Sequence, residues 1–179
     1  MKVVIDTSSL LSLVRYYLPF DRNKILFNFI KDKIENKEII VLDAVFEECS
    51  YTSRGVVVST LDYIKSKKNQ VNTIDLLPTK KFFNQLENNF INTAVKNRLT
   101  DVEFENRKNA FLNSADAKLL LYSQANSSES IIIVSEETEA SNDNKSFKKL
   151  PAICKFLNLE IITLPQLLER YDEINVEFK

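Results

Sequence analysis

Carboxylates that follow apolar segments are the side chains of this sequence best placed to do chemistry. Asp6 directly follows the apolar run 3–5, and hydroxyl residues stand behind it at 7–9. If the run is a buried strand of an open α/β sheet, Asp6 lies at the strand's carboxyl end, where such sheets place their ligand sites. Because burying an unpaired charge costs several kcal/mol at least, Asp6 needs a compensating group or ion.

Other acids occupy comparable positions, since the carboxyl ends of parallel strands and the N-termini of the following helices meet at one edge of a sheet. The candidates that join Asp6 there are Glu47, Glu48, Asp116, Glu136 and Glu137. With no arginine partner evident in the sequence, these carboxylates would repel one another unless a divalent cation lay between them. Carboxylates and hydroxyls are the ligands of hard cations such as Mg²⁺ or Mn²⁺, so the pattern predicts a metal site.

Helix geometry favours Glu48 over its neighbour Glu47. At about 100° per residue, the apolar stripe of the helix that holds both acids passes through Val45, Phe46 and Cys49. Glu48 borders this stripe, whereas Glu47 points nearly the opposite way. We therefore expect Glu48 to be the half-buried acid.

Each of these acids also has an ordinary structural explanation. Glu48 can be a surface glutamate, and Asp116 can stabilise the dipole of the helix that it begins. Glu136 and Glu137 can belong to a solvated loop. Asp6 has the fewest structural uses, because it closes a buried strand. The metal-site hypothesis therefore depends on the joint placement of the acids.

The composition excludes several other kinds of site. The chain has no histidine and no tryptophan, and Gly55 is its only glycine. Without histidine there is no Ser-His or Cys-His nucleophile and no His-ligated zinc. Without glycines neither a P-loop nor a GxGxxG turn can form. Cys49 and Cys154 lie far apart in apolar surroundings and are expected to be buried free thiols.

The net charge of −1 excludes a broadly basic nucleic-acid binder but leaves room for a local basic rim. Such a rim would contact phosphates and carry affinity without sequence specificity. Its candidates are Arg15, Lys80, Lys81, Arg107, Lys108, Lys118 and the lysines of the run 145–149. A solvated surface is the ordinary explanation for any one of them.

Apolar runs rich in β-branched residues predict the strands that must position these side chains. They cover 3–5, 38–42, 131–134 and 160–163, and a weaker strand is expected near 71–76. Helical patterns separate the runs, which is typical of a parallel sheet with helices on both faces. We therefore predict an α/β fold with three α/β/α layers and a central, mostly parallel sheet of about four to five strands.

Helical periodicity predicts helices over 21–37, 43–50 and 56–67, with Asp43 as the cap of the second. From 79 to 111 the sequence is helical by pattern and has no strand candidate. An all-helical insertion should therefore lie between the two halves of the sheet. Ser114 then caps a strong helix with an apolar stripe.

At 179 residues the chain is long enough for one domain with a real core and too short for two, so we expect a single domain over 1–179. No stretch approaches the roughly 20 apolar residues of a membrane span, and the N-terminus enters a strand without the layout of a signal peptide. These features predict a cytoplasmic protein with no membrane partner.

In order and spacing, the motifs resemble those of the PIN-domain superfamily, the metal-dependent ribonucleases that include VapC-type toxins. The strand that ends at Asp6 resembles the opening motif of that family, and Glu48 resembles its second acid. Asp116, near the start of an Ala- and Leu-rich helix, resembles the third. The run Ser135-Glu136-Glu137 is similar to the family's Thr-x-Asp motif, which would give the fourth position to Glu137.

The resemblance implies a PIN-like fold and a metal-dependent endoribonuclease that hydrolyses RNA phosphodiester bonds, with a toxin of a toxin–antitoxin system as one version. Asp6, Glu48, Asp116 and Glu137 would be its catalytic residues and would hold one or two Mg²⁺ or Mn²⁺ ions, partly through water. RNA would be the substrate, and an antitoxin protein and a second copy of the chain are open as partners. The segment 150–163 is similar to a PIN-like branch of unknown function.

Two other interpretations stay open. One is a PIN-like module that binds RNA or protein without cleaving, which the glutamate at the fourth acidic position favours. The other is an aspartate-nucleophile phosphatase, although Ser8 stands where such enzymes place a second Asp. The sequence also leaves open the class of RNA, the choice between RNA and DNA, and whether Glu136 or Glu137 is the fourth ligand.

Overall fold

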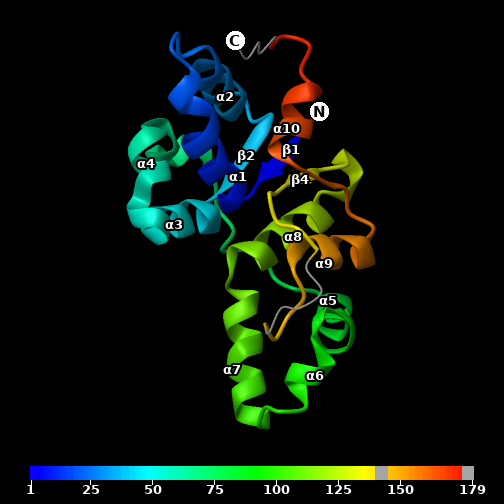
Figure 1. Cartoon of the computed structure of the whole chain (residues 1–179). Coiled ribbons are helices and arrows are strands. Elements are labelled where there is room, and N and C mark those ends of the chain that lie inside the picture. The colour runs from blue at the N-terminus through cyan, green and yellow to red at the C-terminus, as the bar shows by residue number, and fades with distance from the viewer. Residues whose placement is uncertain (140–144, 175–179) are drawn as a thin grey trace.

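A parallel sheet occupies the centre of the protein, shown here as a computed structural model that describes residues 1–139 and 145–174. Within those residues five strands pair in the order β3-β2-β1-β4-β5, and every pairing is parallel. The strands are β1 (Val3–Ile5), β2 (Ile39–Leu42), β3 (Gln70–Val71), β4 (Ile132–Val134) and β5 (Ile161–Ile162). Helices flank the sheet, so the predicted three-layer α/β fold is confirmed (Figure 1).

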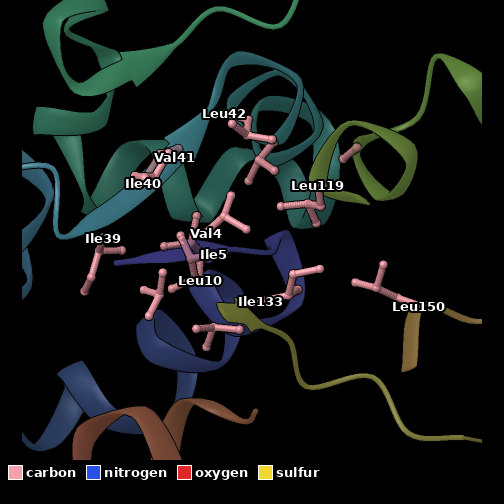
Figure 2. Close-up of a cluster of buried hydrophobic side chains, with 14 of the residues drawn as sticks. Val4, Ile5, Leu10, Ile39, Ile40, Val41, Leu42, Leu119, Ile133 and Leu150 are labelled. Atoms are coloured by element: carbon pink, nitrogen blue, oxygen red, sulfur yellow. The ribbon is translucent and has the colours of Figure 1, made fainter. Parts of the chain in front are cut away.

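The three central strands, β1, β2 and β4, are buried over their whole length. Such continuous apolar runs are typical of parallel strands covered on both faces. Val4 is paired with Ile40 of β2 on one side and with Ile133 of β4 on the other. Helices add further apolar side chains to this core, among them Leu10, Leu119 and Leu150 (Figure 2).

The helices of the first half are α1 (Thr7–Ser12), α2 (Ile25–Glu35), α3 (Asp43–Tyr51) and α4 (Val56–Thr60). α1, which continues into a π-helical turn at Leu13–Tyr17, is absent from the sequence prediction. Its first turn consists of hydroxyl residues, whose preference for turns and caps hides the helical pattern.

In this half, α2 and α4 are shorter than the helices predicted over 21–37 and 56–67. The carboxylate of Asp21 accepts hydrogen bonds from the N–H groups of Ile25 and Phe27, so α2 begins only after a turn. The helix expected over 56–67 ends at Thr60 and is followed by 3₁₀ turns. Asp43 is the first residue of α3 rather than its cap.

The predicted all-helical insertion is present at one end of the molecule (Figure 1). It contains α5 (Lys80–Gln85), a π-helical turn, α6 (Thr93–Lys96) and α7 (Asp101–Leu112). α7 begins with a capping box between Thr100 and Glu103, and its residues, all described, include none that is buried. A single antiparallel bridge joins Ile91 of the insertion to Phe147.

The second half of the sheet is framed by α8 (Ala115–Ala125), α9 (Leu150–Leu157) and α10 (Leu164–Glu169). As predicted, Ser114 caps α8, and its hydroxyl accepts a hydrogen bond from the N–H of Ala117. Part of the predicted polar loop at 135–145 lies outside the described residues. In the part that the structure describes, no helix has both the length and the apolar character that a membrane crossing requires.

Candidate functional site

The strand order changes direction between β1 and β4, and this point defines the candidate site. β2 and β3 lie beyond β1, whereas β5 lies beyond β4. In open α/β sheets the loops that leave such a point diverge, which leaves a crevice at the carboxyl ends of the strands where ligands bind. Asp6 follows β1 and Ser135 follows β4, so both lie at this crevice.

Asp6 is held in place by hydrogen bonds at both carboxylate oxygens. Its Oδ1 accepts the N–H of Thr7 at 2.7 Å and thereby caps α1. Its Oδ2 accepts the hydroxyls of Ser8 at 2.6 Å and Ser135 at 2.9 Å. The residue is only 4% exposed. These donors come from both sides of the crevice, so the orientation of the carboxylate is fixed.

Glu48 approaches Asp6 from α3 through a shared neighbour. The hydroxyl of Thr7 donates a hydrogen bond of 2.7 Å to Oε2 of Glu48, while the N–H of the same Thr7 binds Asp6. Glu48 is partly buried and Glu47 is exposed, as the helix geometry predicts. α3 therefore directs Glu48 toward the crevice and Glu47 toward solvent.

Asp116 lies in the first turn of α8. Within the described part of the chain, its negative charge has fewer hydrogen-bond donors around it than the charges of Asp6, Glu48 and Glu137 have. Burial is the largest cause of the rise in the pKa of its carboxyl from 3.8 to about 7. The negative charges of Asp6, Glu137 and Glu48 raise this pKa further, while the positive charge of Lys145 lowers it. Among the hydrogen bonds between described residues, none reaches the Asp116 carboxylate. The protein thus brings four acids within electrostatic range without pairing this one.

The two glutamates after β4 have different surroundings. Oε1 of Glu136 accepts the N–H of Leu164 at 2.6 Å, and Oε2 of Glu137 accepts the N–H of Leu150 at 3.2 Å. These N–H groups open α10 and α9 and have no partner inside their helices. Only Glu137 lines the same pocket as Asp116 and acts on its pKa. Glu137 therefore lies on the Asp116 side of the crevice. Glu136 lies near the start of α1, where its Oε1 accepts the hydroxyl of Ser9 at 3.4 Å and its N–H donates to Oγ of Ser8.

A pocket of about 480 Å³ adjoins these acids. Asp116 and Glu137 line it together with residues of α7 and of the segment 145–149. The sequence patterns contain no signal that would pair α7 with that segment, because their contact depends on how the insertion folds back.

The candidate basic residues have different surroundings, and only some of them line the pocket. Arg107 and the lysines of 145–149 line the pocket. Lys108 instead forms ion pairs with Glu87 and Glu105. Lys118 donates to the carbonyl oxygens of Thr73 and Leu76. Both lysines therefore have structural roles.

The donor set suits a hard cation held partly through water. In residues 1–139 and 145–174, no three acids lie close enough together to bind one ion directly. Mg²⁺ does not require this, because it usually keeps several waters and takes only one or two protein carboxylates. A cation beside Asp116 would compensate the burial and the negative charges that raise its pKa.

Comparison with known families gives one match. A family model described as "Domain of unknown function (DUF4411)" matches residues 3–174. No curated protein and no solved structure matches the chain. The matched residues span β1 to the end of α10, so they include every acid of the candidate site.

Proposed function

The chain belongs to the DUF4411 family, a family without an assigned function, and we propose that it is a metal-dependent endoribonuclease with the site layout of the PIN-domain superfamily. Asp116 carries this proposal. Its pKa of about 7 reflects burial beside the negative charges of Asp6, Glu137 and Glu48 at the switch point of the sheet. Carboxyl groups gathered in this way are typical of sites that bind Mg²⁺ or Mn²⁺.

The residues of the site would have distinct tasks. Asp116 and Glu137 would hold the cation from the pocket side, and Asp6 and Glu48 would hold it from the side of β1 and α3, partly through water. Thr7, which binds both of the latter acids, fixes their relative positions. When bound, such an ion supplies an activated water for in-line attack on a phosphodiester and neutralises charge on the leaving oxygen. This chemistry fits a chain that has no histidine.

A second candidate function is a module that binds RNA or protein without cutting. The absence of three directly converging acids among the described residues favours it. The hydroxyls of Ser8 and Ser135 also occupy Oδ2 of Asp6. In such a module these bonds would simply stabilise the crevice, and the acids would bind no ion.

Cleavage of a mixed RNA substrate with Mg²⁺ or Mn²⁺ tests the proposal. We expect Asp6→Asn and Asp116→Asn to lose activity by a factor on the order of one hundred or more, since even indirect partners of metal ligands contribute ten- to one-hundred-fold. Glu47→Gln, which removes an exposed acid next to Glu48, is the matched control and should retain activity.

The results separate the two candidate functions. Equal cleavage by the wild type and both asparagine variants would exclude the nuclease site. A wild type that binds RNA but cuts none with either ion would favour the binding module.

A further inference from the structure

The pocket beside Asp116 contains side chains that the proposed cleavage chemistry leaves unused. Arg107, from α7, is the first of them, and its Nη1 donates a hydrogen bond of 2.7 Å to Oγ of Ser146. This bond connects the insertion to the segment that follows β4. Further positive charges line the same pocket, from Lys145, Lys148 and Lys149. Cations therefore line the pocket alongside the acids Asp116 and Glu137.

An aromatic pair lines the same pocket. The rings of Phe111 and Phe147 have centroids 4.7 Å apart and are inclined by 32°. Phe147 is buried, whereas Phe111 remains partly exposed. Phe111 thus offers an apolar ring within a pocket that also holds positive charge.

We propose that this pocket binds one unpaired nucleotide of the RNA strand, next to the bond that is cut. Arg107 would contact the phosphate and Phe111 the base. The inference depends on the proposed function for its substrate class, because the neighbouring acids make RNA the ligand only if they form the proposed nuclease site. A base in a duplex is stacked and paired, and proteins that read it through aromatic contacts require it to be splayed out.

Among the described residues that line the pocket, Arg107 is the only arginine. Lys108, the next residue, is occupied by Glu87 and Glu105 and does not line the pocket. The Nζ of Lys148 lies over the ring of Phe156, 4.4 Å from its centroid, and this contact holds the ammonium group beside that ring. A guanidinium can also bind a phosphate in two places at once, which an ammonium cannot.

Binding measured without cleavage tests the pocket. The probes are a fluorescein-labelled single-stranded oligoribonucleotide and a blunt-ended duplex of that strand with its complement, titrated by anisotropy in EDTA. Arg107→Ala should weaken binding of the single strand roughly tenfold and lower the slope of log K against log salt by about 0.7. Phe111→Leu should weaken it roughly fivefold or more without changing that slope.

Two controls match these variants. Arg98→Ala removes the same charge from the exposed turn between α6 and α7, outside the pocket. Phe20→Leu removes an exposed ring from another part of the chain. Both should bind as the wild type does, and thermal melting should show that all four variants are folded. Arg107→Lys, which keeps the charge, should show the wild-type salt slope with weaker binding.

The outcomes distinguish this pocket from the cleavage proposal. The pocket is excluded if the duplex binds as tightly as the single strand, or if Arg107→Ala and Phe111→Leu bind no worse than their controls. If the variants behave as expected but the wild type cuts no RNA with Mg²⁺ or Mn²⁺, the nuclease proposal fails and the pocket stands. If RNA is cut while both variants bind normally, the pocket alone fails.

Discussion

Asp116 shows how a single residue can reduce the stability of the fold that holds it. Because its pKa in the folded protein lies near 7 rather than at 3.8, the unfolded chain loses this proton at a lower pH than the folded protein does. The free energy of unfolding therefore falls as pH rises from about 4 to about 7, and it stays lowered above that range. Such a cost is common where carboxylates are gathered for function.

Asp116→Asn should consequently stabilise the metal-free protein at pH 8. A shift from 3.8 to about 7 corresponds to at most about 4 kcal/mol, and partial exposure of the carboxyl reduces this to roughly 1 to 2 kcal/mol. At pH 4 the two proteins should differ little. Urea unfolding in EDTA at both pH values measures the difference, and a variant no more stable than the wild type at pH 8 would contradict the charge argument.

The acids could be proposed from the sequence, and the hydroxyls of Thr7, Ser8 and Ser135 could be expected to hydrogen-bond a ligating carboxylate, but the acid that each hydroxyl binds could not be predicted. Asp6 is identified by the strand that it closes, and Glu48 by its phase on α3. The hydroxyl of Ser135, by contrast, reaches Asp6 across 129 positions of sequence. Such a contact depends on which strands become neighbours, and no local pattern specifies that.

At the scale of elements, the turn between α3 and α4 is the most constrained piece of backbone. Ser53, Arg54 and Gly55 have consecutive φ angles of 52°, 59° and 70°. A Cβ added at Gly55 would lie 2.9 Å from the carbonyl oxygen of Ser50. The guanidinium of Arg15 donates to the hydroxyl of Ser53 at 2.7 Å and fastens the turn to the first helical segment.

Gly55→Ala and Arg54→Gly should therefore change stability in opposite directions. We expect Gly55→Ala to lower the free energy of unfolding by roughly 1 to 3 kcal/mol, because the new methyl meets backbone and the conformation is left-handed. Arg54→Gly relieves a left-handed cost of about 1 kcal/mol, which the greater freedom of glycine in the unfolded chain partly offsets. Chemical denaturation of both variants tests this, and a neutral Gly55→Ala would show that the turn relaxes.

The elements predicted best are those that the core determines most strongly. The three central strands β1, β2 and β4 lie where continuous β-branched runs predict them, and such runs are typical of parallel strands that are buried on both faces. β3, which is two residues long and only partly buried, lies slightly before its predicted position. The helix expected over 56–67 forms only as far as Thr60, because Leu61, with φ −99° and ψ 62°, leaves helical geometry.

Across the whole molecule, stability should be uneven between the sheet and the insertion. α7 has no buried residue, whereas α8, of almost equal length, has six. Local opening needs least free energy where little apolar surface is buried. Hydrogen exchange should therefore be faster in α7 than in α8 by a factor on the order of one hundred or more. Equal protection of the two helices would mean that the insertion unfolds only with the core.

The hydrogen bond between Ser135 and Asp6 also has a consequence for the order in which the protein is made. Translation releases β1 and its aspartate first, while Ser135 emerges 129 residues later and Leu164, which holds Glu136, later still. A nascent chain therefore exposes an acidic strand end with no assembled crevice around it. Under the proposed function, the ribosome that makes this protein carries an inert chain, and cleavage begins only with the finished molecule.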